Sequence, residues 1–334
     1  INQVGAALTE TPPAVYALYV YNGNPFHTLP NQRRVAAGLA REDLFTVVHE
    51  QVMTDTARFA DILLPATAQF EQFDLHTSTW HYYLSVNRPC VPPPGECKSN
   101  FEVFQLLAQR LGVKDELLDL APEAVAERLL ANPHPYLDGI DLGKLIEAGS
   151  IHLRTPEIPF VPFADGRFPT PSGKVELYSE AMAQNDLDPL PRWVPPSESA
   201  MGSPDLHSKF PLMLLTPSGR SFLNSTFADV PSLRASDGGR PVLEIHPADA
   251  ASRGVNAGDL VEVRNDRGVC FLYARVTEDV PPGTVASSGM WWSQDRPGRG
   301  TPNATTSCRL SDLGRGSTFN TNLVEVTRIS EERR

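Results

Sequence analysis

One polar segment of the sequence has the residue types that phosphate-binding loops use. The segment TPSGRSFLNST, residues 216–226, combines hydroxyl side chains and a glycine with Arg220. Backbone N–H groups in such a turn can bind phosphate oxygens, and an arginine can form paired hydrogen bonds with them. A polar loop between two strands would have a similar composition, so both a phosphate site and a plain connection remain open for this segment.

A polar pair, His49 and Glu50, ends the apolar run LFTVVHE, and Asn22 and Asn24 follow the earlier run VYALYVY in the same way. Ligands bind at the carboxyl ends of strands in parallel α/β sheets, so all of these residues are candidates for ligand contacts. Strand ends are also often solvated. This second interpretation stays open for His49 and Glu50.

Familiar catalytic motifs do not occur in the sequence. It contains no GxSxG, HExxH, GxGxxG or P-loop pattern, which removes support for serine hydrolysis, zinc proteolysis and NAD binding. The cysteines form no CxxC pair, so neither a zinc site nor the ligand set of an iron–sulfur cluster is indicated, and they are interpreted as reduced thiols: Cys90, Cys97, Cys270 and Cys308. Several histidines are interpreted as surface residues: His27, His76, His81 and His207.

The charge balance limits the classes of partner. The 334 residues include 29 basic and 40 acidic side chains, which gives a formal net charge of −11. A chain with this charge is not expected to bind nucleic acid or an anionic membrane surface as its main partner. Because no run of about 18 apolar residues occurs, no membrane-spanning helix is expected either. The length suits two or three domains.

The first part of the chain has the pattern of a parallel α/β sheet. Strand-like apolar runs at residues 15–21, 44–50 and 61–66 alternate with helix-like segments, which is the order typical of such sheets. Residues 67–98 lack a clear periodicity, and we interpret them as a long ordered loop over a site.

Two helices are predicted after this loop. Ser99 and Glu102 have the spacing of a capping box, and the helix that they begin should end before Gly112. A second helix is predicted over residues 121–130, with a proline in its first turn.

The last part of the chain has the pattern of a small barrel. Residues 186–210 are rich in proline and serine and are interpreted as a connector between domains. Beyond this connector, strand-like runs alternate with turns and one short helix, PADAASRG, as is typical of a small closed β barrel. Strands are predicted at residues 210–216, 241–246, 258–265, 269–277 and 283–292.

Five segments match a known family in the order in which that family has them. They are NGNP (22–25), TDTARFADILLPA (54–66), PPGECKSNFEVFQLLAQRLG (93–112), FPTPSGKVELYS (168–179) and HPADAASRGVNAGDLVEVRNDRG (246–268). One of them alone would be a weak match, but together they span most of the chain. On these segments the chain resembles the carboxyl-terminal half of a molybdopterin-dependent oxidoreductase of the dimethyl sulfoxide reductase, formate dehydrogenase and periplasmic nitrate reductase superfamily.

The resemblance implies a fold and a cofactor. It implies an α/β domain, truncated at its amino terminus, over residues 1–185, a linker at 186–210, and a double-psi β barrel over residues 211–334. The α/β part would carry one half of a site for bis-molybdopterin guanine dinucleotide with molybdenum or tungsten. The barrel would hold the cofactor from the other side.

The resemblance also implies which residues contact the cofactor. Glu50 would accept hydrogen bonds from a guanine edge, and Arg220 would neutralise phosphate. Relatives often have Ser or Gln at the position of His49, can have lysine at that of Gln72, and usually have aspartate at that of Asn100. The expected contacts are Asn22, Asn24, His49, Glu50, Thr54, Gln72, Asn100, Thr216, Ser218, Gly219, Arg220, Ser221, Phe222, Asn224, Ser225, Trp292, Asn303 and Asn320. No catalytic residue and no metal ligand is assigned.

The family's reaction needs parts that this sequence does not show. Neither the cysteine cluster of a [4Fe–4S] centre nor the family's Ser, Cys, selenocysteine or Asp ligand to molybdenum is recognisable. We therefore expect a missing amino-terminal half or a split subunit that carries them, an electron-transfer subunit and a small-molecule substrate as partners, and no catalysis by the isolated chain. The sequence begins at Ile1 without a methionine, so the true start is expected upstream. The cytoplasm is favoured, and a periplasmic location stays open.

The function that we predict is a two-electron molybdenum or tungsten oxidoreductase that transfers an oxygen atom or a hydride equivalent. One alternative is a cofactor-carrier or interaction module without redox activity of its own. Another is an α/β hydrolase or transferase that uses Glu71 or His81 as acid or base. The first alternative predicts material without molybdenum and pterin, and the second predicts activity without a metal. The substrate stays undetermined.

Overall fold

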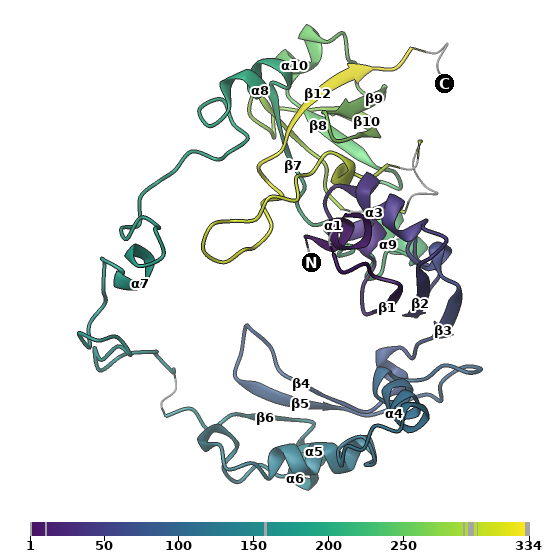
Figure 1. Cartoon of the computed structure of the whole chain (residues 1–334), viewed down its shortest axis with the longest axis vertical. Helices are drawn as coiled ribbons and strands as arrows, with labels where there is room; N and C mark the ends of the chain where they lie inside the picture. The colour runs from purple at the N-terminus through teal and green to yellow at the C-terminus, as the bar shows by residue number, and fades with distance from the viewer. Residues whose placement is uncertain are drawn as a thin grey trace. The chain divides into compact units, whose positions relative to one another are not determined.

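The computed structural model describes residues 2–10, 12–156, 159–289, 291–292, 297–298 and 300–330 (Figure 1). The chain forms two compact units. The first, unit 1, comprises Ile1–Leu64 and Pro195–Arg334, and the second, unit 2, comprises Pro65–Val194. Unit 1 therefore combines the beginning of the chain with its end. The division into residues 1–185, a linker at 186–210 and residues 211–334 refers to the domains of the family and stays a prediction.

A three-stranded sheet in unit 1 confirms the predicted parallel α/β arrangement. Its strands are β1 (Ala17–Tyr21), β2 (Phe45–Glu50) and β3 (Ile62–Pro65), in the order β1-β2-β3. Strands β1 and β2 are parallel, and Tyr21 lies opposite His49. The residues that follow these two strands therefore lie at the same edge of the sheet.

Short helices pack against this sheet because their apolar side chains share one face. The elements are α1 (Val4–Thr9), α2 (Pro25–Thr28), α3 (Gln32–Leu39) and the 3₁₀ turn η1 (Ala57–Phe59). Val35 and Leu39, four residues apart on α3, are buried in a cluster with Leu8, Leu29 and Leu44. This cluster holds the segment that contains α2 against the sheet.

The second part of unit 1 is a closed six-stranded barrel, which confirms the predicted barrel. Its strand order is β10-β8-β11-β7-β12-β9. The strands are β7 (Leu212–Leu215), β8 (Val242–Ile245), β9 (Leu260–Arg264), β10 (Val269–Val276), β11 (Thr284–Ala286) and β12 (Leu323–Arg328). Strand β12 was not predicted. The strand predicted over residues 283–292 is too long, because β11 ends at Ala286.

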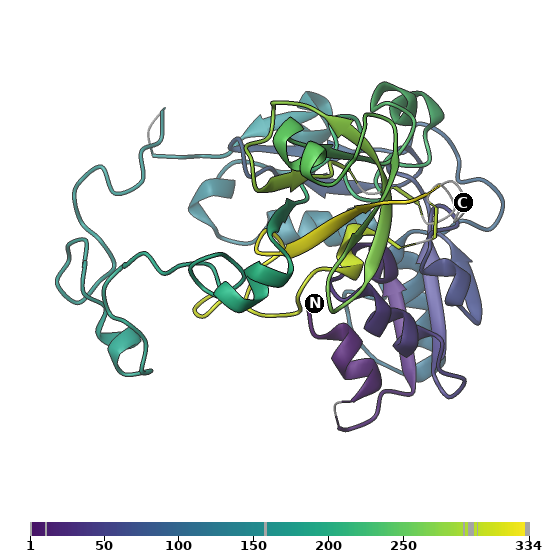
Figure 2. The same ribbon diagram turned by 90° about the horizontal axis from the view of Figure 1, so that it is seen from above.

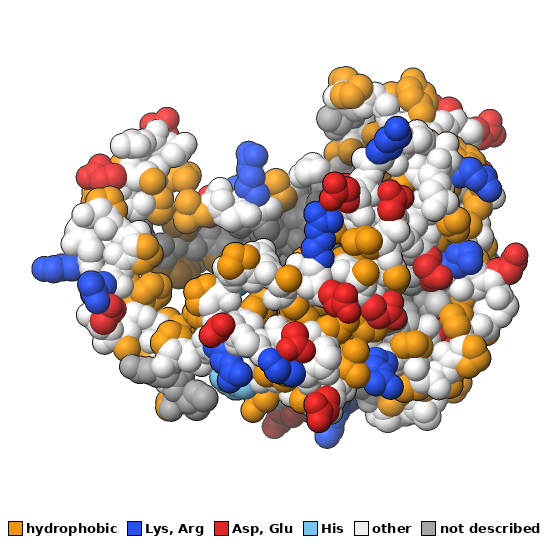
Figure 3. Space-filling view, turned by 90° about the horizontal axis from the view of Figure 1, so that it is seen from below, with side chains coloured by type: hydrophobic (Ala, Val, Ile, Leu, Met, Phe, Trp, Pro, Cys, Tyr) orange, Lys and Arg blue, Asp and Glu red, His pale blue; other side chains and the backbone are white. Residues whose placement is uncertain are grey.

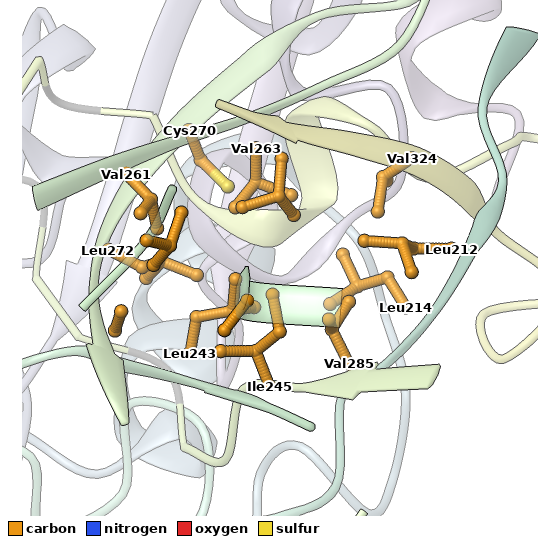
Figure 4. Close-up of a cluster of buried hydrophobic side chains, with 14 residues drawn as sticks. Leu212, Leu214, Leu243, Ile245, Val261, Val263, Cys270, Leu272, Val285 and Val324 are labelled. Carbon is orange, nitrogen blue, oxygen red and sulfur yellow. The ribbon is translucent and has the colours of Figure 1, made fainter. Parts of the chain in front are cut away.

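The barrel interior is filled with aliphatic side chains (Figure 4). Along β10, Cys270, Leu272 and Ala274 are buried, whereas their neighbours are more exposed. This alternation places every second side chain inside the barrel. Because closure pairs every strand on both sides, the barrel is a rigid support for the loops at its ends.

Among the described residues, α8 (Pro204–Lys209) precedes β7, and the elements that connect barrel strands are α9 (Pro231–Ser236), α10 (Pro247–Ser252) and the 3₁₀ turn η5 (Pro302–Ala304). Each begins at a proline, whose fixed φ suits the first helical position. In Figures 1 and 2 the purple amino-terminal helices lie beside the yellow-green segment that carries η5, and Thr301 donates its backbone N–H to Gln32 at 2.8 Å.

Unit 2 contains an antiparallel sheet with β4 (Asp74–His76), β5 (Tyr83–Asn87) and β6 (Ser150–His152). Its other elements are η2 (Gln69–Glu71), α4 (Asn100–Leu111), α5 (Pro122–Leu130), η3 (Pro135–Leu137), α6 (Leu142–Ala148) and α7 (Glu180–Ala183). The capping box of Ser99 and Glu102 is confirmed, and so is the end of α4 at Gly112, whose φ of 68° is left-handed. The interpretation of residues 67–98 as a loop is wrong in part, because this segment contains the hairpin of β4 and β5.

Acidic and basic side chains are interspersed on the face shown in Figure 3, among the residues that the structure describes. In the same described part of the chain, no helix has the length and hydropathy to cross a membrane.

Candidate functional site

A pocket in unit 1 brings together four segments that are far apart in the sequence. Its volume is ≈ 110 Å³, enough for one group such as a phosphate but not for a whole dinucleotide. The lining comes from the end of α2, the loop after β7, the turn after β11, and the segment from η5 to β12. The lining residues are Thr28, Thr216, Pro217, Ser218, Asn224, Gly289, Asn303 and Phe319.

The loop after β7 is held in shape by a carboxylate from α9. Asp237, at the end of α9, accepts hydrogen bonds from the Ser221 backbone N–H at 3.2 Å and the Ser221 hydroxyl at 2.8 Å. Asn224 has a φ of 51°, in the left-handed region that asparagine tolerates. The phenyl ring of Phe222 is buried against Trp291, with ring centroids 5.4 Å apart. The loop is therefore anchored at Ser221 and Phe222, between the lining residues Ser218 and Asn224.

Gly219 is needed in this loop because the backbone passes very close to its neighbours. A Cβ atom at Gly219 would lie 2.9 Å from Asp237 Oδ2, 3.0 Å from Phe222 O and 3.2 Å from Gly289 Cα. The two glycines therefore allow two backbone segments of the pocket to approach each other without side chains between them.

The segment around η5 forms a buried wall of the pocket. Asn303 is 6% exposed, and its amide donates to the His27 carbonyl at 3.1 Å. On the other side of η5, Asn31 donates its backbone N–H to the Thr306 carbonyl at 3.0 Å. Asn303 is thus held in place by the segment that contains α2 and α3, 276 residues away in the sequence.

His27 is a buried residue, so its interpretation as a surface histidine is wrong. Its side chain is 0% exposed, and Nδ1 lies 2.9 Å from Oδ2 of Asp55, itself 4% exposed. The imidazole also lies 5.5 Å from the ring of Trp292, whose Nε1 donates to the Ala228 carbonyl at 3.0 Å. His27 and Asp55 form a polar pair directly beside Thr28 of the pocket.

The strand ends carry buried polar groups. Asn24 is 2% exposed, and its Oδ1 accepts from the Thr56 hydroxyl at 2.6 Å. Its Nδ2 has no hydrogen-bond partner among the described residues. His49 and Thr54 are each 1% exposed, and the Thr54 hydroxyl accepts from the Ala57 N–H at 3.1 Å. An unsatisfied buried donor such as Asn24 Nδ2 is unusual and is available to a ligand.

Glu50 lies at the carboxyl end of β2 and is partly buried. Burial raises the pKa of its carboxyl group, and the hydrogen bond from the Gln51 N–H and the nearby His49 oppose that shift. Two residues further on, Val52 packs against the cluster of Phe222, Ala228, Trp291 and Trp292. The end of β2 and the pocket loop therefore meet at one apolar cluster.

Four of the eighteen predicted contacts line the pocket: Thr216, Ser218, Asn224 and Asn303. Five others belong to the same loop or to the apolar cluster of Phe222 and Trp292: Gly219, Ser221, Phe222, Ser225 and Trp292. Three are exposed and lie outside the pocket lining: Asn22, Arg220 and Asn320. Gln72, whose Oε1 accepts from the Thr67 hydroxyl at 2.6 Å, and Asn100, at the start of α4, belong to unit 2.

Sequence reasoning missed several residues of the pocket. Thr28, Gly289 and Phe319 line it, and Asp237 holds its loop. No local pattern marks Thr28 or Phe319, because each reaches the pocket through contacts across the fold. Gly289 lies within the strand predicted over residues 283–292, where an isolated glycine indicates a close approach of another backbone segment. Among the described residues, no group of three or more His, Cys, Asp or Glu side chains could hold a metal ion.

Two family models match parts of the chain. Residues 3–110 match the model "Molybdopterin oxidoreductase", and residues 212–323 match the model "Molydopterin dinucleotide binding domain". Of the residues that line the pocket, all but Thr28 lie within the second match.

Individual proteins and a solved structure are also similar to the chain. It is 39% identical over 330 residues to a probable oxidoreductase, YoaE, of Bacillus subtilis strain 168, with 98% of this chain and 46% of that protein covered. It is 32% identical over 309 residues to the dimethyl sulfoxide reductase DmsA of Escherichia coli strain K12, with 85% and 38% covered. Acetylene hydratase from Pelobacter acetylenicus shares the fold, with a TM-score of 0.77, 24% identity, and 98% and 46% covered. The chain spans less than half the length of each.

Proposed function

Because the chain belongs to the molybdopterin oxidoreductase superfamily, we propose that the pocket of unit 1 binds the dinucleotide part of a molybdopterin cofactor. The observation that carries this proposal is the lining of the pocket. Two hydroxyl groups and two amides converge there, on segments where glycines let the backbone come close: Thr216, Ser218, Asn224 and Asn303.

The residues present fit such a group. Phosphate and ribose oxygens need several short polar side chains and backbone N–H groups, which this loop supplies. The pocket volume of ≈ 110 Å³ suits one phosphate or ribose rather than the whole cofactor. The unsatisfied Nδ2 of Asn24 offers a further donor in unit 1. More specifically, we propose that the cofactor is bis-molybdopterin guanine dinucleotide. We also propose that the barrel is of the double-psi type and that the domains have the limits predicted from the sequence.

The chain's own part in the reaction is to bind and orient the cofactor. When bound, the cofactor would supply two-electron chemistry at its molybdenum or tungsten. Thr216, Ser218 and Asn303 would donate hydrogen bonds to the dinucleotide. Arg220, exposed on the same loop, would neutralise phosphate charge, and the carboxylate of Glu50 would accept hydrogen bonds from a guanine edge.

The activity of the whole protein is a further part of this proposal. Because DmsA is named a dimethyl sulfoxide reductase, we propose transfer of an oxygen atom, with a hydride equivalent as the other two-electron outcome. The region that binds the metal and a [4Fe–4S] cluster would belong to an amino-terminal half or a separate subunit. An electron-transfer subunit would be a further partner.

A pair of isosteric changes in the full-length protein tests the binding site. Thr216→Val and Ser218→Ala together remove two hydroxyl groups from the pocket with little change in volume. Each neutral hydrogen bond contributes about 1 kcal/mol, so the cofactor should bind roughly 30-fold more weakly. Molybdenum and pterin content after purification, together with the rate of pterin release, measure this loss.

Thr327→Val is the matched control, because Thr327 is exposed on β12 and its hydroxyl is outside the pocket lining. It should retain the cofactor fully. Full retention by the double variant would refute the proposed site. Wild-type protein without metal or pterin would instead favour the carrier or interaction module without redox activity.

A further inference from the structure

A largely buried ion pair joins the connector to the barrel. Arg267, in the turn between β9 and β10, donates from Nη1 to Glu198 Oε1 and from Nη2 to Glu198 Oε2, both at 2.8 Å. The side chains of Arg267 and Glu198 are 24% and 12% exposed. Glu198 also accepts from the Leu323 backbone N–H at 3.3 Å, at the start of β12. Paired arginine–carboxylate hydrogen bonds in such a setting fix both geometry and distance.

The same guanidinium holds the segment that carries Asn303. Arg267 Nε donates to the Thr305 carbonyl at 2.6 Å, and Asn265 Nδ2 donates to the same oxygen at 2.8 Å. Asn322 completes the network, because its Oδ1 accepts from Arg267 Nη2 at 3.1 Å and its Nδ2 donates to the Thr305 hydroxyl at 2.8 Å. Thr305 is therefore fixed by donors from two turns of the barrel.

The backbone of this turn also contacts η5 directly. A Cβ atom at Gly268 would lie 2.6 Å from the Ala304 carbonyl oxygen, so the turn and η5 touch without a side chain between them. Residues 301–306 are all buried. Asn303 is thus clamped between the Arg267 turn on one side and, on the other, the His27 carbonyl.

From these contacts we propose that Arg267 is a positioning residue for the cofactor pocket, acting through Thr305 on Asn303, and that Glu198 ties the connector to the same network. This inference rests on the proposed function of the pocket. Since a coupling between two sites is reciprocal, cofactor binding should also stabilise the connector around Glu198. Arg267 itself lies outside the pocket lining.

The chain offers a matched ion pair for comparison. Arg253 Nε donates to Glu325 Oε1 at 2.7 Å, with side chains 16% and 24% exposed. This pair lies on the same barrel and is buried to a similar degree, but neither partner bonds to η5 or lines the pocket. Loss of either pair should lower barrel stability similarly, whereas only loss of the Arg267 pair should disturb Asn303.

The experiment compares cofactor release from full-length, cofactor-loaded Arg267→Met, Arg267→Lys, Glu198→Gln and Arg253→Met proteins, below the unfolding temperature of each. Outer-shell changes of this kind typically cost about 10- to 100-fold in affinity at metal sites, so we expect pterin release from Arg267→Met to be roughly tenfold faster than from wild type. Arg267→Lys and Glu198→Gln keep part of the network and should give smaller increases. Arg253→Met should release pterin within about twofold of the wild-type rate, because no hydrogen bond to η5 is lost.

Proteolysis of the connector provides a second readout. In wild type, cofactor loading should slow cleavage between residues 186 and 203, and this protection should be reduced in Glu198→Gln. Release from Arg267→Met at the wild-type rate would overturn the positioning role, and so would equal acceleration in Arg253→Met. Wild-type protein that never holds the cofactor would overturn the proposed function instead, so the two failures are distinguishable.

Discussion

Replacing Gly219 with alanine should displace the loop that lines the pocket, because the added methyl group has no space. The new Cβ would lie 2.9 Å from Asp237 Oδ2, 3.0 Å from Phe222 O and 3.2 Å from Gly289 Cα. Two of these atoms belong to the backbone and cannot rotate away. The third, Asp237 Oδ2, accepts a hydrogen bond from the Ser221 N–H, and Oδ1 of the same carboxylate accepts one from the Ser221 hydroxyl. The φ of Gly219 is not left-handed, so the effect is steric rather than conformational.

The expected magnitude follows from the number of close contacts. Inserting a methyl group into a well-packed site typically costs about 1–3 kcal/mol. We expect a shift of residues 216–218 to relieve the strain, because the barrel strands are hydrogen-bonded on both sides and resist displacement. We therefore expect a small loss of thermal stability and a loss of about 2 kcal/mol in cofactor affinity, which is roughly 30-fold.

Molybdenum and pterin content, with the thermal unfolding midpoint, measure both effects in the full-length protein. Gly314→Ala is the matched control, because a Cβ at Gly314 meets no atom within 4 Å. This control should behave as wild type in both assays. Wild-type cofactor content and stability in Gly219→Ala would refute the steric reasoning and the assignment of this loop to the site.

Three further changes test other parts of the site and fold. Arg220→Ala should lose much of the cofactor, because a cation beside the phosphate is removed, and full retention of metal and pterin would refute that role. Glu50→Gln should raise the unfolding midpoint of the cofactor-free protein near pH 7.5, with a gain that shrinks toward pH 4. Burial raises the pKa of Glu50, so its carboxyl group is neutral in the folded protein at low pH. As the pH rises through that raised pKa, the carboxyl group becomes charged in a partly buried site, which lowers the free energy of unfolding, and the glutamine variant avoids this loss. An equal gain at both pH values would contradict this cause. Leu272→Ala should lower the free energy of unfolding by about 3 kcal/mol, because Leu272 is 0% exposed in the barrel core. Denaturant unfolding measures this loss, and a loss below about 1 kcal/mol would show that the interior is not closely packed.

The sheet and most of the barrel could be predicted from the sequence because local patterns determine them. Continuous apolar runs marked β1 and β2, and the alternation in VCFLYARV marked β10. The capping box at Ser99 and the glycine at 112 fixed the ends of α4 within one residue. Such features depend on neighbours a few residues apart, and a sequence shows those directly.

The remaining features depend on contacts across the chain. Asn303 is held by the carbonyl of His27, 276 residues away, and the buried imidazole of His27 pairs with Asp55, 28 residues away. Neither relation leaves a pattern in the surrounding residues. The hairpin of β4 and β5 was missed because its strands have only three and five residues. Apolar and polar side chains do alternate along both strands, but over so few residues this period is not distinctive.

Some site residues were predicted from the chemistry of their own segment, and others from the resemblance to a family. Thr216, Ser218 and Asn224 were suggested by the composition of their own segment, which the pocket lining brings together. Asn303 was suggested by the resemblance alone, because an isolated asparagine is usually a turn residue. Gln72 and Asn100, which were suggested in the same way, lie in unit 2, and their contact with a cofactor stays a prediction.

The central claim is that the pocket of unit 1 holds the dinucleotide of the cofactor, and a structure of the full-length protein purified with its cofactor tests this most directly. We predict that a phosphate or ribose of the dinucleotide lies within hydrogen-bonding distance of Thr216, Ser218 and Asn303. A cofactor bound elsewhere, with only solvent against these three side chains, would contradict the claim.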